Sequence, residues 1–288
     1  MAAPGLTVLL TSDWQCGEPF LPAAAQAMMR LVPRIRPDVF IAAGDLTQRA
    51  KAREFRTALE LIGRLPSVPV IATPGNHDVP LYRVWERLFA PFWNWKRFIS
   101  HRLDTVTRID GATFVTLNSA APRRAIVNGR LDGSQLDFAE RAFAEAPERD
   151  ARCLVVHHHF VPVPDGEGGH PLPGAARSLE RIEEMGVDIV FGGHVHQTHI
   201  STSRSVLTGR DGHGVPIVAC GTTLSRRGRG VERGANTLNV VRIDEASVEV
   251  TPYRLQEGAA EFLEQETRVL PRPRASGSGK ASVEGNAR

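Results

Sequence analysis

Short runs of apolar, often β-branched residues alternate through the first two thirds of the chain with longer stretches whose apolar residues recur every three or four positions. The short runs predict buried strands, and the longer stretches predict helices that pack against them. The expected strands are residues 6–10, 38–43, 68–72, 112–117, 152–156 and 187–191, and the expected helices are residues 22–31, 53–65 and 135–144. Strands separated by helices predict βαβ units and a largely parallel sheet.

The pattern changes after Ile200, where short apolar runs are separated by glycine-rich turns. Residues 215–219, 237–243 and 247–253 predict the strands of a second, more antiparallel sheet. The segment 82–101 is rich in aromatic residues and is compatible either with a helix over the mouth of a site or with ordinary core. Because large aromatic side chains are usually buried, we favour the core for this segment.

The end of the chain has a different composition from the rest. Beyond about Arg268 it is largely Pro, Gly, Ser and Arg, with too few apolar residues to form a core. We therefore expect one domain over residues 1–267 and a disordered tail over residues 268–288.

The distribution of charge disfavours nucleic acid as a partner. The tail contains five basic residues and one acidic residue, a net charge of +4, which leaves −1 for the remainder of a chain whose total is +3. A nucleic-acid interface needs its basic residues on a folded surface. A second basic cluster, Arg226, Arg227 and Arg229, lies in a glycine-rich turn, where a solvated loop is favoured over an anion contact.

Cysteine usage and the N-terminus predict a cytoplasmic protein. Cys16, Cys153 and Cys220 lie far apart, an odd number that indicates reduced thiols. The first ten residues lack the basic region of a signal peptide, and we expect no membrane span because no apolar stretch reaches about 18 residues. Nothing in the pattern indicates an oligomeric state.

Five of the expected strands are followed by polar residues that can bind a metal ion. These residues are Asp13; Asp45; Asn76 with His77; His157 with His158 and His159; and His194 with His196. The carboxyl ends of parallel strands gather along one edge of an open α/β sheet, so these side chains should converge. One such residue would be explained by a turn or a helix cap, but five together indicate a site.

The residue types at these strand ends suit two divalent cations. Carboxylate, amide oxygen and imidazole are ligands for Mn, Fe or Zn. Two cations in one site need a ligand that reaches both, which a carboxylate can do, and Asp45 is our candidate for that bridge. Gly75 and Gly193 precede other candidate ligands, where a small residue allows a tight turn.

The order of the motifs resembles that of the calcineurin-like metallophosphoesterase superfamily over roughly residues 6–255. The matching segments are Gly44-Asp45, Gly75-Asn76-His77-Asp78, His157 and Gly193-His194-Val195-His196. Residues 44–50 and 74–83 are most similar to bacterial phosphodiesterases of the cyclic-nucleotide type. The resemblance implies an α/β fold, a four-layer double β-sandwich flanked by helices.

The resemblance also implies a role for each residue at the site. One metal ion would be held by Asp13, Asp45 and His196. The other would be held by Asp45, Asn76, His157 and His194. His77 would act beside them as an acid and a phosphate contact. Strand alternation places His157 and His159 on one face and His158 on the other, and the family order selects His157 as the ligand.

The chain departs from the family in its first motif, which is usually Asp-x-His but here is Asp13-Trp14-Gln15. Gln offers a neutral amide oxygen, a weaker ligand than imidazole for a transition metal. Three alternatives stay open: Gln15 coordinates a metal ion, the first metal ion binds weakly or through an extra water, or the protein keeps the fold without the activity. Gln15 remains in our candidate ligand set.

The function implied by the resemblance is metal-dependent hydrolysis of a small-molecule phosphate ester by a water that the two cations activate. A diester is favoured over a monoester. The alternatives are a phosphomonoesterase, a pyrophosphatase acting on a nucleotide-linked lipid, and a non-catalytic binding module with an impaired first metal site.

Overall fold

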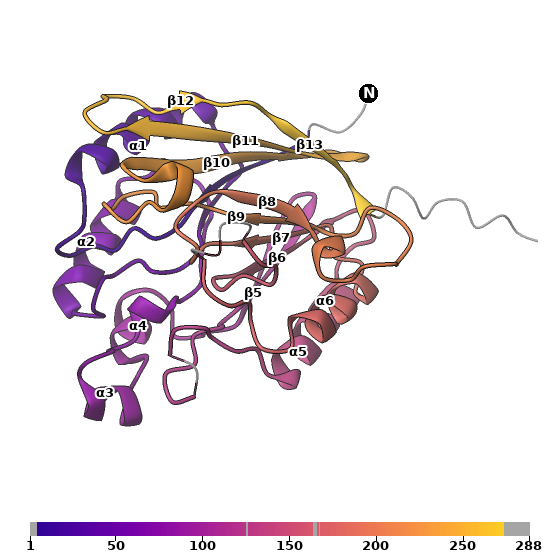
Figure 1. Cartoon of the computed structure of the whole chain (residues 1–288), viewed down its shortest axis with the longest axis horizontal. Coiled ribbons are helices and arrows are strands. Elements are labelled where there is room, and N and C mark those ends of the chain that lie inside the picture. The colour runs from indigo at the N-terminus through magenta and orange to yellow at the C-terminus, as the bar shows by residue number, and fades with distance from the viewer. Residues whose placement is uncertain (1–4, 125, 164–165, 167, 274–288) are drawn as a thin grey trace, which may run out of the picture.

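The computed structural model describes residues 5–124, 126–163, 166 and 168–273, and within them the strands form two mixed sheets (Figure 1). The seven strands of the first sheet run in the order β12 (Leu263–Glu264), β11 (Ser247–Gln256), β10 (Ala235–Ile243), β1 (Leu6–Thr11), β2 (Val39–Ala42) and β3 (Val70–Ala72), with β13 (Arg268–Pro271) paired to β11. The six strands of the second run in the order β4 (Thr105–Ile109), β5 (Ala112–Leu117), β6 (Ala151–Val156), β7 (Ile189–Gly192), β9 (Pro216–Ala219) and β8 (His199–Thr202).

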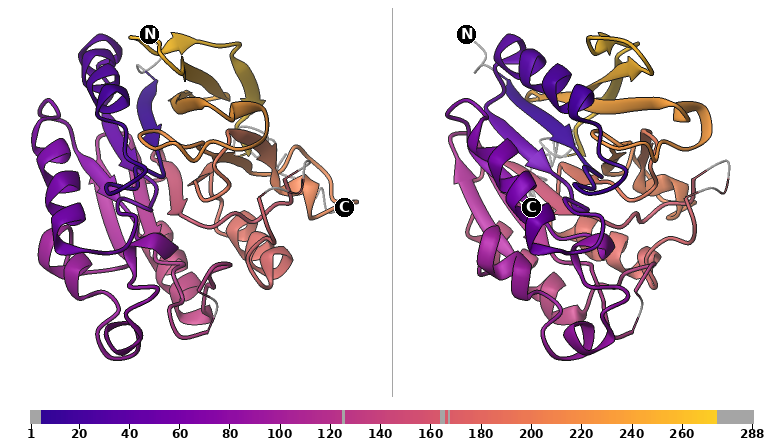
Figure 2. Two further views of the ribbon diagram at one scale, coloured as in Figure 1. Left: turned by 60° about the vertical axis from the view of Figure 1, so that its left-hand side comes forward. Right: turned by 90° about the vertical axis from the view of Figure 1, so that its left-hand side faces the viewer.

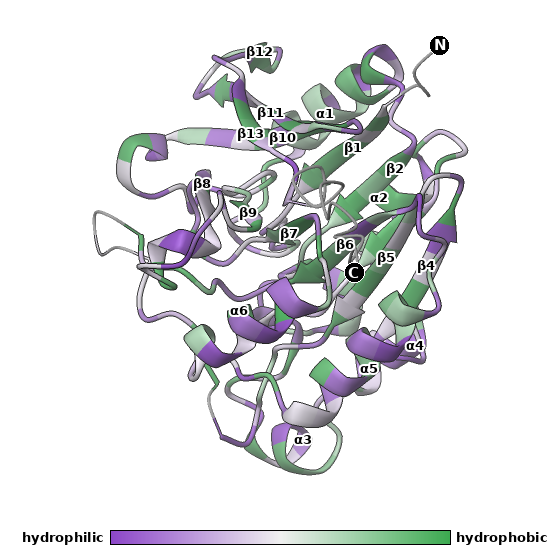
Figure 3. Cartoon of the chain, turned by 90° about the vertical axis from the view of Figure 1, so that its right-hand side faces the viewer, coloured by the Kyte–Doolittle hydropathy of each residue, from purple (hydrophilic) through white to green (hydrophobic). Residues whose placement is uncertain are grey.

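The two sheets pack face to face, and helices cover their outer faces (Figure 2). Alternation along β1 shows how the layers form: Val8 and Leu10 enter the core between the sheets, whereas Leu9 enters the core beneath the helices. Helices α1 (Pro22–Ile35) and α2 (Ala52–Gly63) contribute to the outer core of the first sheet, and α5 (Gly133–Ala144) and α6 (Ala175–Glu184) to that of the second. Central strands such as β1 and β5 are hydrophobic along most of their length (Figure 3). The four-layer α/β sandwich is therefore confirmed.

The expectation of a separate antiparallel sheet after residue 200 is wrong. Strands β8 and β9 extend the sheet that contains β7, and β10 pairs antiparallel with β1. The second sheet thus has a parallel centre with two antiparallel edges. The first sheet is parallel from β1 to its edge at β3 and antiparallel on the side of β10. The apolar pattern predicts that a segment is a strand, but pairing depends on which existing sheet edge needs a hydrogen-bonding partner.

The aromatic segment divides between core and surface. It forms the short helices α3 (Val84–Phe89) and α4 (Trp93–Phe98). Trp95 is 1% exposed and packs edge-on against Phe55 of α2, with ring centroids 6.3 Å apart. Tyr82, Trp85, Phe89 and Trp93 are instead 66–75% exposed. The core prediction is confirmed for Trp95 and wrong for these four side chains.

The ordered structure continues beyond the predicted start of the tail. Strand β13 pairs with β11, with Leu270 opposite Val248, and the Arg272 guanidinium contacts the Asp188 carboxylate at 2.9 and 3.1 Å. The boundary at residue 267 is therefore too early, and the remainder of the predicted tail, residues 274–288, lies outside the described residues.

Three short 3-10 helices, η1 (Asn76–Asp78), η2 (Ser203–Ser205) and η3 (Gly230–Glu232), complete the described part of the fold. In the described part of the chain, every helix is too short or too polar to cross a bilayer.

Candidate metal centre

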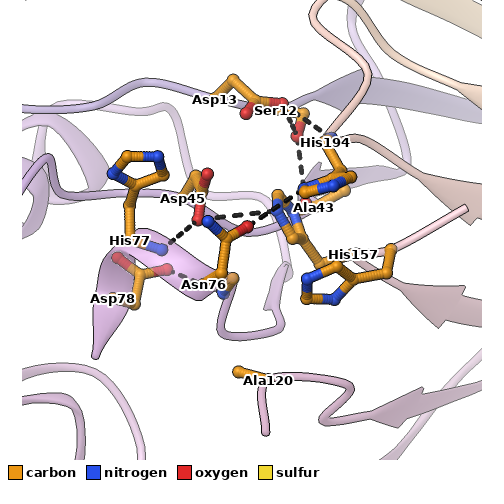
Figure 4. A network of polar contacts seen from close by, with 12 residues as sticks. Ser12, Asp13, Ala43, Asp45, Asn76, His77, Asp78, Ala120, His157 and His194 are labelled. Carbon is orange, nitrogen blue, oxygen red and sulfur yellow. Dashed lines mark hydrogen bonds and ion pairs between the residues drawn. The ribbon is translucent and has the colours of Figure 1, made fainter. Parts of the chain in front are cut away.

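The loops that follow β1, β2 and β6 bring Asp13, Asp45 and His157 together at one edge of the sandwich (Figure 4). One ligand atom from each of the three side chains lies within 4.8 Å of the others. His157 Nε2 is 3.5 Å from Asp45 Oδ1. His196, which follows β7, places its Nδ1 3.6 Å from Asp13 Oδ1.

Asn76 and His194 complete this group of strand-end residues. The side-chain oxygen of Asn76 lies 3.0 Å from His194 Nδ1, and the backbone N–H of His194 donates to Asp13 Oδ2 at 3.0 Å. The backbone N–H of His77 donates to Asp45 Oδ1 at 2.8 Å. Residues from five separate loops are therefore neighbours in space, as Figure 4 shows for most of them.

The backbone is strained at the candidate ligands. Positive φ angles occur at Asp13 (54°), Gln15 (45°), Asp45 (53°), His194 (73°) and His196 (59°). This left-handed region is uncommon for residues other than glycine, and such residues often cluster at functional sites. Only Arg36 and Ala50 share this conformation among the non-glycine residues that the structure describes.

Three glycines allow the loops to approach each other closely. A Cβ atom at Gly44, Gly75 or Gly193 would collide with the His157 ring, the Asp45 carboxylate or the Ser12 hydroxyl, respectively. Gly44 also has a φ of +88°, whereas Gly75 and Gly193 do not have positive φ angles. At Gly75 and Gly193 the requirement for glycine therefore comes from close approach rather than from the turn conformation.

Three buried ligand atoms lack a hydrogen-bond partner among the described residues: Asp13 Oδ1, Asp45 Oδ2 and His157 Nε2. Buried polar atoms are nearly always paired in folded proteins, because an unpaired one costs about 1–3 kcal/mol. Carboxylate oxygen and imidazole nitrogen are suitable ligands for divalent transition metals. The side chains therefore fit the cations that the family implies.

Hydrogen bonds orient two of the histidine rings. The Nδ1 of His157 lies 2.7 Å from the Ala43 carbonyl oxygen, which can accept only from a protonated nitrogen. That bond leaves Nε2 of His157 with the lone pair that a metal ligand needs. The Nδ1 of His196 lies 2.8 Å from Thr222 Oγ1, which fixes the second ring in a similar way.

The electrostatics of the site favour bound positive charge. Burial, partly offset by His157 and reinforced by Asp45, raises the pKa of Asp13 to about 7. Burial acts in the same direction on Asp45, but His157 and His77 hold the pKa of that carboxyl well below its usual range. Burial would lower the pKa of His157, yet Asp45 and Asp13 raise it to about 9. The two acidic residues that raise the pKa of His157 would likewise attract a bound cation.

His158 also comes within ligand distance of His157 and His194, but its ring is already engaged. Its Nδ1 lies 2.7 Å from Ser119 Oγ, and its Nε2 lies 3.1 Å from the Val127 carbonyl oxygen. With both nitrogens bonded, His158 is a poorer ligand than His157.

Gln15 is buried beside Asp13, and its amide oxygen is hydrogen-bonded. Oε1 accepts a hydrogen bond from Ser225 Oγ at 3.0 Å, whereas Nε2 has no partner in the described structure. The amide oxygen has two lone pairs, and the bond from Ser225 uses one of them.

One residue close to the site differs from its sequence interpretation. Arg227, in the loop between β9 and β10, is half-buried, and its Nη1 lies 3.0 Å from His77 Nε2. Its charge also acts on Asp13 and Asp45. The interpretation of this cluster as a solvated loop is therefore wrong for Arg227. No spacing in the sequence identifies this arginine, because its contact with His77 spans 150 residues.

Comparison with known proteins agrees with this geometry. The chain is 25% identical over 219 residues to a "Probable cyclic nucleotide phosphodiesterase" of Rhodococcus erythropolis, covering 71% of this chain and 67% of the relative. It is 26% identical over 181 residues to the "3',5'-cyclic adenosine monophosphate phosphodiesterase CpdA" of Escherichia coli K12, covering 60% of this chain and 61% of the relative. The chain thus spans about two thirds or less of the length of these curated relatives.

Solved structures show the same architecture. Purple acid phosphatase PPD1 from yellow lupin superposes with a TM-score of 0.69 at 14% identity, covering 94% of this chain and 54% of that one. Residues 6–198 match the family described as "Calcineurin-like phosphoesterase". With this match and the sandwich fold, the chain belongs to the calcineurin-like phosphoesterase family.

Proposed function

We propose that this chain is a metal-dependent phosphodiesterase that hydrolyses a small-molecule phosphate diester with two divalent cations of the Mn, Fe or Zn type. The observation that carries the proposal is the group of buried, unpartnered ligand atoms on Asp13, Asp45 and His157. The similarity to proteins named as cyclic nucleotide phosphodiesterases supports a diester substrate.

Each candidate ligand has a proposed place in the centre. Asp13, Asp45 and His196 would hold one cation. Asp45, Asn76, His157 and His194 would hold the other, so that Asp45 is shared. When bound, the two cations supply the positive charge that activates a water and offsets negative charge on the phosphate oxygens.

We assign His77 and Arg227 to the substrate phosphate. The Nδ1 of His77 lies 2.9 Å from the Gln48 carbonyl oxygen, which fixes the ring and leaves Nε2 as the acceptor for Arg227. A phosphate oxygen would compete for the Arg227 guanidinium, because charge-assisted hydrogen bonds to phosphate are stronger than bonds to a neutral ring. Release from Arg227 would then allow Nε2 of His77 to carry a proton to the leaving oxygen.

Gln15 bears on the strength of the first cation site. Of the three alternatives we favour the second, in which the cation at Asp13 is held weakly or through a water, because a neutral amide oxygen that it shares with Ser225 is a weaker ligand than imidazole.

A pyrophosphatase acting on a nucleotide-linked lipid is the second candidate function. It is favoured by a groove of about 800 Å³ that is lined by Phe89 and Trp93 and reaches Asn118 and Ala120. Ser119, which lies between Asn118 and Ala120, places its hydroxyl 2.7 Å from the ring of His158, beside the candidate ligand His157.

The test combines metal analysis with hydrolysis of bis-aryl and mono-aryl phosphates by the native chain and by Gln15→His. We expect two cations in the fully loaded native protein, faster hydrolysis of the bis-aryl substrate, and tighter retention of the weaker cation in Gln15→His. Faster mono-aryl hydrolysis would favour a monoesterase. A chain without metal ions or turnover in either form would be a binding module.

A further inference from the structure

Six large apolar side chains on and beside α3 are exposed. We define this aromatic surface as Tyr82, Val84, Trp85, Leu88, Phe89 and Trp93, which are between 37 and 75% exposed. The rings of Trp85 and Phe89 stack with centroids 5.9 Å apart and an interplanar angle of 10°. An exposed apolar cluster of this kind usually marks a site of interaction.

The aromatic surface lies on a projecting but well-anchored part of the molecule. Figures 1 and 3 show α3 protruding from the sandwich. Arg83 ties the segment to the body, because its guanidinium donates to the carbonyl oxygens of Arg49 (2.9 Å) and Ala50 (3.0 Å). The Arg49 guanidinium in turn lies 4.6 Å from the centre of the Tyr82 ring. The side chains are therefore held in their exposed positions by bonds to the body.

Four exposed cations lie on the elements next to the aromatic surface: Lys96 and Arg97 on α4, and Arg123 and Arg124 in the loop after β5. Three of them, Lys96, Arg123 and Arg124, line the same groove as Phe89 and Trp93.

The nearby carboxylates are already engaged. Glu86 pairs with Arg83 at 2.8 Å, and Asp132 pairs with Arg130 at 2.9 Å. The four exposed cations therefore give this face a positive charge.

Charge complementarity decides what covers this surface. A second copy of the chain would bring the same cations face to face, which is unfavourable. Tryptophan and tyrosine flanked by lysine and arginine are the residues that settle at a bilayer interface, where rings enter the head-group layer and cations contact anionic lipids. We propose that the aromatic surface docks on an anionic lipid bilayer.

Docking in this orientation places the candidate metal centre near the lipid head groups. The groove behind the aromatic surface is lined by Asn118 and Ala120. These residues flank Ser119, whose hydroxyl lies 2.7 Å from the ring of His158, next to the candidate ligand His157. Lipid docking nevertheless depends only on the surface and does not require the proposed phosphodiesterase activity.

The test is flotation of the full chain with vesicles of phosphatidylcholine, with or without phosphatidylglycerol. We expect binding only to the anionic vesicles and weaker binding at high salt, because screening weakens the contribution of the cations. The double variant Tyr82→Ser/Trp85→Ser, at two residues outside the lining of the groove, should lower vesicle partitioning about tenfold or more, since two aromatic anchors are lost. The matched control is Val269→Ser, which removes an apolar side chain that is 62% exposed on β13 and should leave partitioning unchanged.

Three results would overturn the proposal: equal binding to neutral vesicles, no binding to either kind, or undiminished binding by the double variant. Self-association of the native chain that the double variant abolishes, without vesicle binding, would instead identify a second copy as the occupant. Hydrolysis of a soluble bis-aryl phosphate by the same proteins separates this question from catalysis. The double variant should keep the native rate whether or not docking occurs.

Discussion

Polar residues are usually exposed and apolar residues usually buried, and the candidate metal centre and the aromatic surface depart from this rule in opposite ways. At the metal centre, Asp13, Asp45 and His157 are fully buried and leave ligand atoms without hydrogen-bond partners in the described structure. On the surface, Trp85 and Phe89 are each 75% exposed to water. Each arrangement costs free energy in the isolated chain, because buried polar atoms lose water and exposed rings fail to gain burial.

Both costs would be offset by a partner from outside the chain. In our proposals, cations would compensate the buried carboxylate and imidazole atoms, and an anionic lipid surface would cover the exposed aromatic rings. The backbone also differs between the two regions: strained φ angles occur at the candidate metal centre but not along α3.

The largest effect should follow from removing the shared carboxylate. Asp45→Asn keeps the shape of the side chain but removes the charge through which both cations are held. We expect a loss of about 10³-fold or more in kcat/KM, because metal ions contribute several kcal/mol of transition-state stabilisation. Metal content should fall in parallel.

The matched control for Asp45→Asn is Asp110→Asn, at an almost fully exposed carboxylate. It should retain the native metal content and rate. Full metal occupancy in Asp45→Asn would contradict the proposal that Asp45 is the shared ligand.

Two tryptophans in α4 provide a sharper test of the difference between buried and exposed aromatic residues. Trp95 is 1% exposed and Trp93 is 66% exposed, although they are two residues apart. Trp95→Ala should lower the free energy of unfolding by about 3–5 kcal/mol because it leaves a cavity in the core. Trp93→Ala should change it by about 0.5 kcal/mol or less. Urea denaturation measures both, and equal losses would show that Trp93 is also part of the core.

A smaller effect should come from His77, which we place at the phosphate rather than at the cations. His77→Ala should slow turnover about 10²-fold, the lower range for a general acid, while both cations remain bound. Steady-state kinetics and metal analysis on the same preparation provide the two measurements. Loss of the metal ions in this variant would contradict the assigned role.

Arg227, which contacts His77, provides a separate test of the phosphate site. Arg227→Lys keeps the positive charge but loses the planar fork that binds a phosphate with two hydrogen bonds. A decrease of about tenfold in kcat/KM with native metal content would place Arg227 at the phosphate, since a charge-assisted bond contributes about 1.5–3 kcal/mol. A native value of kcat/KM would restrict Arg227 to supporting the His77 ring.

The sequence by itself determined the central strands and the polar residues that follow them, but not the strands β4, β8, β12 and β13. Both depend on patterns local to the chain: alternation of apolar residues, and Gly-Asp, Gly-Asn-His-Asp and Gly-His-x-His motifs at strand ends. The ends of β1, β2 and β3 belong to one sheet and those of β6 and β7 to the other. Parallel strands within a sheet share a carboxyl edge, which groups the ends of each sheet, but the two groups meet only because the sheets pack on each other. The family motifs supplied the four-layer arrangement.

Tertiary structure decided the features that depend on contacts between distant residues. Both ring nitrogens of His158 are occupied by Ser119 and Val127, which separates it from His157 only once the loops are packed. Arg227 reaches His77 across 150 residues, and β10 joins the first sheet because β1 offers it an edge. Trp85 and Trp95 belong to one aromatic segment, yet α2 covers only Trp95. The hydrophobic pattern indicates which side chains would be stabilised by burial, whereas actual burial depends on whether another element packs over them.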